Sequence, residues 1–420
     1  MSLDKTPRSN RYHIAILGRM NSGKSSLINA LAQQDVAVVS SIAGTTTDAV
    51  HKAMEIHGTG PVVFIDTPGV DDASLLSEAR ITRTKKAIDS ADLAIVVIDA
   101  PKGEGEPEQK LYAHLEEKQV PYIVAVNKID IGDHEQDSSE SSSPSPGPGH
   151  RPSSSRGTSP PYVHVSAKTQ AGRDKLLKAI SEQAAKAKEQ REPPIVGDLI
   201  NPGEIVLLVI PLDEQAPKGR LILPQVQTIR DILDHNGVAV AVKVEELGQL
   251  FAEPHFSPQL VVTDSQVFQE VDKVVPPSVP LTSFSILFAR HKGNLKLLAQ
   301  GAQALDSLQP GDMVLIAEAC THHPIADDIG TVQIPRLIDA KVGGALVYEW
   351  QKGGDYPEDL TRYKLIIHCG GCMLNRRAMC SRLEAAAHAG VPITNYGMTI
   401  AACHGILPRA LGPFRKTSLI

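Results

Sequence analysis

The chain has 420 residues, of which 42% are hydrophobic and 21% charged, and its formal net charge is −6. One hydrophobic core rarely extends beyond about 250 to 300 residues, so this length predicts two or three domains. The five cysteines form an odd, widely spaced set without a preceding leader, which argues against a secreted disulfide framework and favours the cytoplasm. No apolar run reaches the roughly 18 residues of a membrane helix. The acidic balance argues against nucleic acid as a partner.

The first part of the chain alternates apolar strands with helical stretches. This alternation predicts a doubly wound, mainly parallel sheet in a domain at residues 1–192, which ends at Pro193 and Pro194. A Ser/Pro tract at 138–161 has no aliphatic or aromatic side chain, so we expect a disordered insertion, with a phosphorylated or partner-binding loop as the alternative. Strands are expected at 11–17, 62–65, 93–98, 122–126 and 163–165, and helices at 24–32 and 173–190.

Strands and helices also alternate in two smaller units further along the chain, so the expected fold class is α/β with three domains. The second domain is expected at 193–278, with strands at 205–210, 238–242 and 260–262 and a helix near 226–233. The third is expected at 279–420, with strands at 313–317, 345–350 and 365–368 and helices at 293–305 and 376–389.

The strongest motif is a GxxxxGK[ST] pattern at residues 18–25, between the first strand and the first helix. Its glycines let backbone N–H groups surround phosphates, Lys24 reaches the β and γ phosphates, and the Ser25 hydroxyl ligates Mg²⁺. This context predicts a nucleoside triphosphate site. The loop residues expected to bind the nucleotide are Gly18, Asn21, Ser22, Gly23, Lys24, Ser25 and Ser26.

Further segments follow in the order that phosphate-loop GTPases show. Thr46 is expected to complete the Mg²⁺ shell, Asp66 to hold the metal through water, and Gly69 to donate a backbone N–H to the γ-phosphate. The Asp130 carboxylate can accept hydrogen bonds from the N1–H and 2-amino group of guanine, a donor pair that adenine lacks. The motif therefore selects GTP. The residues of the base pocket are Asn127, Lys128, Asp130, Ser166, Ala167 and Lys168.

Val70 stands where Ras-like GTPases have the glutamine that orients the attacking water. The domain resembles the translation-factor-like GTPases that include TrmE and Era, and Asn21 stands where potassium-dependent members carry a metal-contacting asparagine. Our hypothesis is that K⁺, held partly by Asn21, supplies the positive charge that an arginine finger supplies in other GTPases. Alternatively, Asn21 only caps the loop. The residues expected to act in hydrolysis are Lys24, Thr46, Gly69 and Asn21.

A second set of candidate ligands lies in the third domain. Cys320-Thr321-His322-His323 follows one expected strand, and His368-Cys369-Gly370-Gly371-Cys372 follows another. Neighbouring parallel strands can bring both segments to one sheet edge. Three cysteines with histidine permit tetrahedral zinc or a [4Fe-4S] cluster with one exchangeable position, and unrelated core thiols remain a third reading. The candidate fourth ligands are His322, His323, His368, Asp327, water or a partner group. Cys380 and Cys403 are interpreted as buried packing residues.

This combination resembles the [FeFe]-hydrogenase maturation GTPases (HydF type) over nearly the whole chain. Three further segments carry the resemblance, at 218–225, at 322–324 with 328–330, and at 395–399. The Ser/Pro insertion at 138–161 departs from the family pattern.

The resemblance implies a scaffold and carrier. Its middle domain would form a homodimer, and Cys320, Cys369 and Cys372 would hold a [4Fe-4S] cluster. The protein would accept a diiron (2Fe) precursor from radical-SAM maturases and transfer it to apo-[FeFe]-hydrogenase, with GTP hydrolysis to GDP as a switch. The alternatives are a GTPase acting on RNA or ribosomes with a structural zinc, and a GTP-dependent metallochaperone for another metal.

Overall fold

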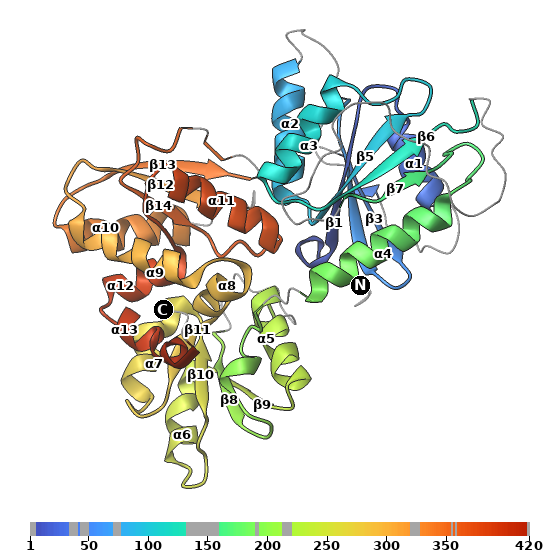
Figure 1. Cartoon of the computed structure of the whole chain (residues 1–420). Helices are drawn as coiled ribbons and strands as arrows, with labels where there is room; N and C mark the ends of the chain where they lie inside the picture. The colour runs from blue at the N-terminus through green and yellow to red at the C-terminus, as the bar shows by residue number, and fades with distance from the viewer. Residues whose placement is uncertain are drawn as a thin grey trace. The chain divides into compact units, whose positions relative to one another are not determined.

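The computed structural model describes residues 6–32, 41–42, 50–69, 77–131, 159–189, 193–211, 221–319, 328–353, 356–357 and 359–417. The chain divides into two compact units, Met1–Arg191 and Glu192–Ile420, whose elements are labelled in Figure 1. Most of the expected insertion, up to residue 158, lies outside the described residues. Within the described ranges, no helix combines the length and the apolar character needed to cross a membrane.

The first unit contains one seven-stranded sheet in the order β2-β3-β4-β1-β5-β6-β7. The strands β4, β1, β5, β6 and β7 are parallel, and β2 and β3 add an antiparallel edge, so the expected mainly parallel sheet is confirmed. Its strands are β1 (Tyr12–Leu17), β2 (Ser41–Ile42), β3 (Val50–Ile56), β4 (Gly60–Asp66), β5 (Leu93–Asp99), β6 (Tyr122–Asn127) and β7 (Tyr162–His164). Its helices are α1 (Lys24–Ala32), α2 (Ser77–Ser90), α3 (Glu106–Glu117) and α4 (Arg173–Glu189).

Two apolar layers cover this sheet, with α1 and α4 on one face and α2 and α3 on the other, as Figure 1 shows. Successive side chains of a strand point to opposite faces. Ile14 and Ile16 of β1 therefore pack with α1 and α4, whereas Ala15 and Leu17 pack with α2 and α3. Because the sheet is covered on both sides, its polar functional groups can lie only at the strand ends.

The second unit contains two four-stranded, wholly parallel sheets, in the orders β11-β10-β8-β9 and β13-β12-β14-β15. Their strands are β8 (Ile205–Val209), β9 (Val238–Val242), β10 (Leu260–Thr263), β11 (Leu281–Ser283), β12 (Met313–Glu318), β13 (Val347–Lys352), β14 (Leu365–His368) and β15 (Ile393–Asn395). The helices are α5 (Leu223–Asp234), α6 (Leu247–Ala252), α7 (Phe268–Val274), α8 (Phe284–Lys292), α9 (Leu295–Gln303), α10 (Ile334–Val342), α11 (Arg376–His388), α12 (Tyr396–Cys403) and α13 (Leu407–Ala410).

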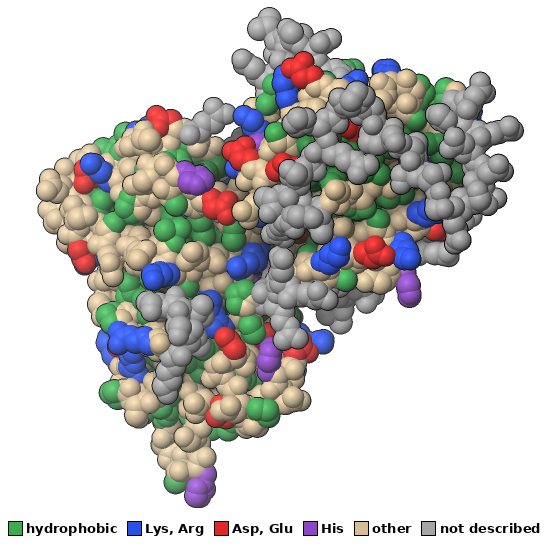
Figure 2. All heavy atoms as spheres, viewed as in Figure 1, with side chains coloured by type: hydrophobic (Ala, Val, Ile, Leu, Met, Phe, Trp, Pro, Cys, Tyr) green, Lys and Arg blue, Asp and Glu red, His purple; other side chains and the backbone are tan. Residues whose placement is uncertain are grey.

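These two sheets share one hydrophobic core. Leu207 and Val261 of the second sheet, Leu287 of α8, and Ile366 and Ile393 of the third sheet all belong to it. The strand β11 pairs with β10, so the second sheet extends past residue 279. The domain boundary expected at 278–279 stays a prediction. On the face in view in Figure 2, acidic and basic side chains lie intermingled over the described residues.

The strand β9 is one of the two edge strands of the second sheet. Its sequence, Val-Ala-Val-Ala-Val, is wholly apolar, and Val238 is 44% exposed. The neighbouring helix α5 adds two more exposed apolar side chains, Val226 at 48% and Leu233 at 57%. An apolar edge strand is a template for pairing with another chain, so this edge is where we expect the predicted homodimer to form.

The first prediction concerns this edge. Lysines at Val238 and Ala241 place charges on β9 and are expected to shift the protein toward smaller species in size-exclusion chromatography with light scattering, because edge lysines oppose strand pairing. Val274→Lys, at an exposed apolar position on α7, is the control and should leave the mass unchanged. If the double variant has the same mass as the wild type, the dimer interface does not lie at this edge.

Candidate functional site

The phosphate loop joins the carboxyl end of β1 to the first turn of α1. Asn21 and Gly23 both have left-handed backbone angles, with φ of 59° and 90°. Asparagine tolerates this region, and glycine adopts it without cost. A Cβ on Gly23 would also collide with the side-chain amide of Asn127. Glycine is thus required at position 23 by backbone angle and by space.

Lys24 lies inside this loop and is 7% exposed. Its Nζ donates to the carbonyl oxygens of Gly18 at 3.0 Å and Arg19 at 2.7 Å. These bonds hold the ammonium group in the concave side of the loop, where the phosphates of a nucleotide would replace neutral carbonyls with charged acceptors.

Ser25 and Asp66 form the described part of the expected magnesium site. The Ser25 hydroxyl donates to Asp66 Oδ2 at 2.7 Å. The second carboxylate oxygen, Asp66 Oδ1, is buried and has no hydrogen-bond partner in the described part of the chain. A buried carboxylate oxygen without a donor beside a hydroxyl fits a hard cation such as Mg²⁺. Gly69 lies against the backbone of Met20 in the phosphate loop, whereas Thr46 and Val70 are outside the described residues.

Asn127 connects the phosphate loop to the base pocket. Its Nδ2 donates to the Ser22 carbonyl at 2.9 Å, and its Oδ1 accepts from the backbone N–H of Ala167 at 3.0 Å. The side chain is 1% exposed, so losing either contact would leave a buried polar group unpaired. One amide thus holds three of the predicted motifs together.

Asp130 lies beside Ser166 in the predicted base pocket. The Ser166 hydroxyl donates to Asp130 Oδ1 at 2.6 Å and accepts from the backbone N–H of Thr169 at 3.1 Å. The hydrogen bond from Ser166 lowers the pKa of Asp130, so the carboxylate is an ionised acceptor at neutral pH. Ser26 and Lys168 are exposed beside these motifs.

Two acidic residues that sequence reasoning missed support these motifs. Asp99, at the end of β5, accepts from Lys128 Nζ at 2.9 Å. Glu108 of α3 is 1% exposed, forms an ion pair with Arg19 of the phosphate loop, and accepts from the backbone N–H of Gly105 at 2.9 Å. The position of Asp99 at the end of a parallel strand was a usable signal. Glu108 offered none, because acidic residues are common on helices.

Cys369 and Cys372 follow β14, an inner strand, at the carboxyl end of the third sheet. Cys369 Sγ accepts from the backbone N–H groups of Ala319 at 3.2 Å and Gly371 at 3.4 Å. Gly371 reaches this position with a φ of 61°, which favours glycine. Ala319 directly precedes Cys320 in the sequence. Two amide donors at one sulfur are suited to a thiolate or a thiolate ligand.

His368, which the sequence suggested as a possible ligand, is fully buried. Its Nδ1 lies 2.7 Å from the Cys369 carbonyl, and its Nε2 lies 2.8 Å from Arg382 Nη1. Burial, and then the Arg382 charge, lower the pKa of His368 to about 3, so the ring is neutral. Both nitrogens are engaged, which does not favour this histidine as a metal ligand.

The remaining cysteine-site residues, Cys320, His322, His323 and Asp327, lie outside the described residues. Within the described ranges, no group of three Cys, His, Asp or Glu side chains is arranged to hold a metal. The sequence predicts Cys380 and Cys403 as buried packing residues, but both are only partly buried. Burial still raises the pKa of the Cys403 thiol to about 11, which suits a weakly reactive thiol.

Comparisons with known proteins match the first unit to GTPases. A family model described as "50S ribosome-binding GTPase" matches residues 13–128. Over 123 residues, 28% of this chain and 25% of the relative, the chain is 44% identical to GTPase Der of Leptospira borgpetersenii serovar Hardjo-bovis (strain L550). Over 120 residues, 28% and 26% of the two chains, it is 40% identical to tRNA modification GTPase MnmE of Aquifex aeolicus (strain VF5).

The chain thus spans about a quarter of the length of these curated relatives. Among solved structures, the G domain of the T. maritima FeoB iron transporter is 27% identical with a TM-score of 0.28, covering 42% of this chain and 99% of that one. The phosphate loop and the sequence matches define the class of the first unit, a P-loop GTPase domain.

The second unit identifies the family. A model described as "Hydrogen maturase F dimerization domain" matches residues 195–293, and "Hydrogen maturase F tetramerization domain" matches residues 296–413. Together they span more than half of the chain. The chain belongs to the hydrogen maturase F family, so the resemblance seen in the sequence is confirmed. The family models also support self-association.

The second prediction tests base selection by Asp130. Asp130→Asn removes the acceptor for guanine N1–H and offers a donor instead, so GTP affinity should fall at least about tenfold, since a hydrogen bond to a charged group contributes about 1.5 to 3 kcal/mol. Xanthosine triphosphate, which carries an acceptor where guanine has its 2-amino group, should gain affinity. Fluorescence titration with labelled nucleotides measures both. Lys168→Ala leaves the carboxylate in place and should keep the guanine preference; equal affinity of Asp130→Asn and wild type for GTP would contradict the assignment.

Proposed function

We propose that this protein is a GTP-hydrolysing scaffold that carries a [4Fe-4S] cluster and delivers a diiron unit to apo-[FeFe]-hydrogenase. It would receive the diiron precursor from radical-SAM maturases and act as a homodimer. The observation that carries the proposal is the hydrogen bond from the Ala319 N–H to Cys369 Sγ. It brings the residue before Cys320 to the CxxC loop, 50 positions away in the sequence.

The chemistry of the donor set fits a cluster with an open site. Cys320, Cys369 and Cys372 would supply three thiolates, and three thiolates leave one iron of a [4Fe-4S] cluster to a weaker ligand. Such an iron, when the cluster is bound, supplies an exchangeable coordination position for cargo. The N–H groups of Ala319 and Gly371 would stabilise the negative charge on the Cys369 sulfur. His322 and His323 stay candidates for the fourth position, together with Asp327, water or a partner group.

The GTPase domain supplies the switch in this proposal. Lys24 and Ser25 would hold the phosphates and Mg²⁺, and the segments at Thr46 and Gly69 would respond to the γ-phosphate. The Val70 side chain cannot orient the attacking water by hydrogen bonding, so hydrolysis needs another source of catalysis. K⁺ bound partly by Asn21 would provide it by stabilising the charge that develops between the phosphates.

The third prediction tests the cluster. After anaerobic purification or reconstitution, the wild-type protein should be brown and contain about four iron and four sulfide per chain, as a [4Fe-4S] cluster requires. Cys372→Ala removes a ligand and should lose most of the iron. Cys403→Ala, at a partly buried thiol outside the cysteine motif with a raised pKa, is the matched control and should keep it. A colourless wild-type protein with one zinc and no sulfide would remove the cluster from the account.

The fourth prediction tests potassium. GTP turnover should be faster in KCl than in NaCl at equal ionic strength, and Asn21→Gly should abolish the difference. Glycine tolerates the φ of 59° found at this position, so the substitution removes the amide without straining the loop. GTP binding by the variant serves as the control. Equal turnover of the wild type in both salts would refute the role of K⁺.

A further inference from the structure

Arg290 and His291, near the carboxyl end of α8, hold the chain segment that follows the GTPase unit. Arg290 is 2% exposed and binds both carboxylate oxygens of Asp198, at 2.9 and 2.6 Å. The same guanidinium donates to the carbonyl oxygens of Pro194 at 2.6 Å and Ile195 at 3.1 Å. His291 Nδ1 lies 2.8 Å from the Pro193 carbonyl. Residues 193–198 are therefore fixed to the end of α8.

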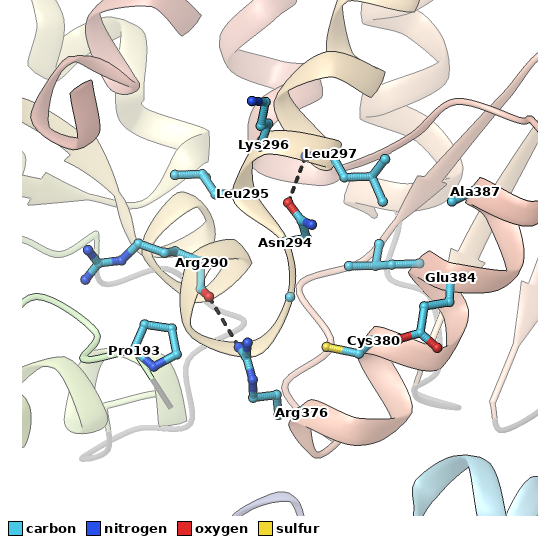
Figure 3. A pocket seen from close by; sticks show the side chains of 12 residues that line it. Pro193, Arg290, Asn294, Leu295, Lys296, Leu297, Arg376, Cys380, Glu384 and Ala387 are labelled. Carbon is cyan, nitrogen blue, oxygen red and sulfur yellow. Dashed lines mark hydrogen bonds between the residues drawn. The ribbon is translucent and has the colours of Figure 1, made fainter. Parts of the chain in front are cut away.

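The next residue, Lys292, holds the cysteine loop. It is 3% exposed, and its Nζ donates to the carbonyl oxygens of Gly371 at 3.4 Å, Cys372 at 3.3 Å and Leu374 at 3.0 Å. The helix after this loop also contacts α8: Arg376, the first residue of α11, donates to the carbonyl oxygens of Arg290 and His291, the first at 3.4 Å (Figure 3).

The segment at 193–198 and α11, the helix after the cysteine loop, both contribute to the lining of one cavity. Pro193, Arg290, Arg376 and Cys380 all line this cavity of about 540 Å³ (Figure 3). The helix α8 is anchored in the shared core by Leu287 and Phe288, so its last turn is a rigid link across this space. A shift of residues 193–198 must move the end of α8 or break the buried charged hydrogen bonds of Arg290, which is costly.

We infer that Arg290, His291 and Lys292 form a clamp that couples the segment after the GTPase unit to the Cys369–Cys372 loop, with Lys292 as a positioning residue of the metal site. The identity of the metal group rests on the proposed function; the coupling itself does not. Cation placement at the end of a helix is favourable on its own, but that leaves unexplained why adjacent residues bind two separate segments. The buried ammonium of Lys292 also places positive charge beside a thiolate site, which favours the reduced form of a bound cluster.

The experiment follows the thiols of the metal-free full-length protein. The rate at which iodoacetamide alkylates Cys372 is measured by peptide mass spectrometry, with GDP and with a non-hydrolysable GTP analogue. We expect the wild-type rate to differ between the two nucleotides. Lys292→Met should change the rate severalfold with either nucleotide, because the carbonyl groups of the loop lose their common donor and the thiols lose a nearby positive charge. Lys296→Met, at an exposed lysine on α9, should behave as wild type.

Asp198→Ala tests the other end of the clamp and leaves Lys292 and the cysteine loop intact. It should keep the wild-type rate with GDP and lose the difference between nucleotides. Any of three results would overturn the clamp. The wild-type alkylation rate could be the same with both nucleotides, or the difference between nucleotides could persist in Asp198→Ala. The third is equal rates for Lys292→Met and Lys296→Met.

A reconstituted sample gives a second readout, since Lys292→Met should lower the midpoint potential of the cluster and Lys296→Met should not. If the wild type binds no iron and sulfide, the proposed function fails while the thiol measurement still decides the coupling.

Discussion

The parallel pairing of β12 with β14 is the constraint on which the candidate metal site depends. It sets Ala317 opposite His368 and lets the Cys369 N–H bond the Ala317 carbonyl at 2.8 Å. Two residues after Ala317, just past the end of β12, the Ala319 N–H donates to Cys369 Sγ. A shift of one residue in this register would turn Cys369 to the opposite face of the sheet. The sheet therefore determines where soft ligands can meet, and the loops supply them.

The same rule organises the nucleotide site of the first unit. Parallel strands deliver the phosphate loop after β1, Asp66 at the end of β4 and Asn127 at the end of β6 to one edge. The buried Asn127 amide then joins the phosphate loop, through Ser22, to Ala167 after β7. Both units use the carboxyl ends of parallel strands, where backbone groups are free of the ladder and a bound ligand can take their hydrogen bonds. GTP and the metal would thus bind at the same kind of place, the carboxyl ends of a parallel sheet, in two different units.

Much of this could be predicted from the sequence, because strong periodicity and motifs are local signals. The helix expected at 24–32 is α1 with the same bounds, and the strand expected at 238–242 is β9. The helix expected at 293–305 is α9, but the preceding helix α8 and the strand β11 were not foreseen. Ser283 caps α8 by accepting from the Ile286 N–H, a short polar signal inside an apolar run.

The hydrogen-bond partners of buried charged side chains could not be predicted from the sequence. Lys292 and Arg290 look like exposed residues of a helix end, because lysine and arginine are rarely buried. Their acceptors lie 79 or more positions away, so only the tertiary fold reveals them. His368 shows the reverse case. Its place beside Cys369 suggested a ligand, whereas the buried Arg382, on the following helix, engages its ring.

The central claim is that three thiolates hold a cluster and leave one iron open. The most direct measurement is the Mössbauer spectrum of the protein reconstituted with ⁵⁷Fe and sulfide, before and after addition of a small ligand such as cyanide. We expect three iron sites of one kind and one distinct site, and only the distinct site should change when the ligand is added. Four equivalent iron sites that ignore the ligand, or a protein that holds zinc and no sulfide, would contradict it.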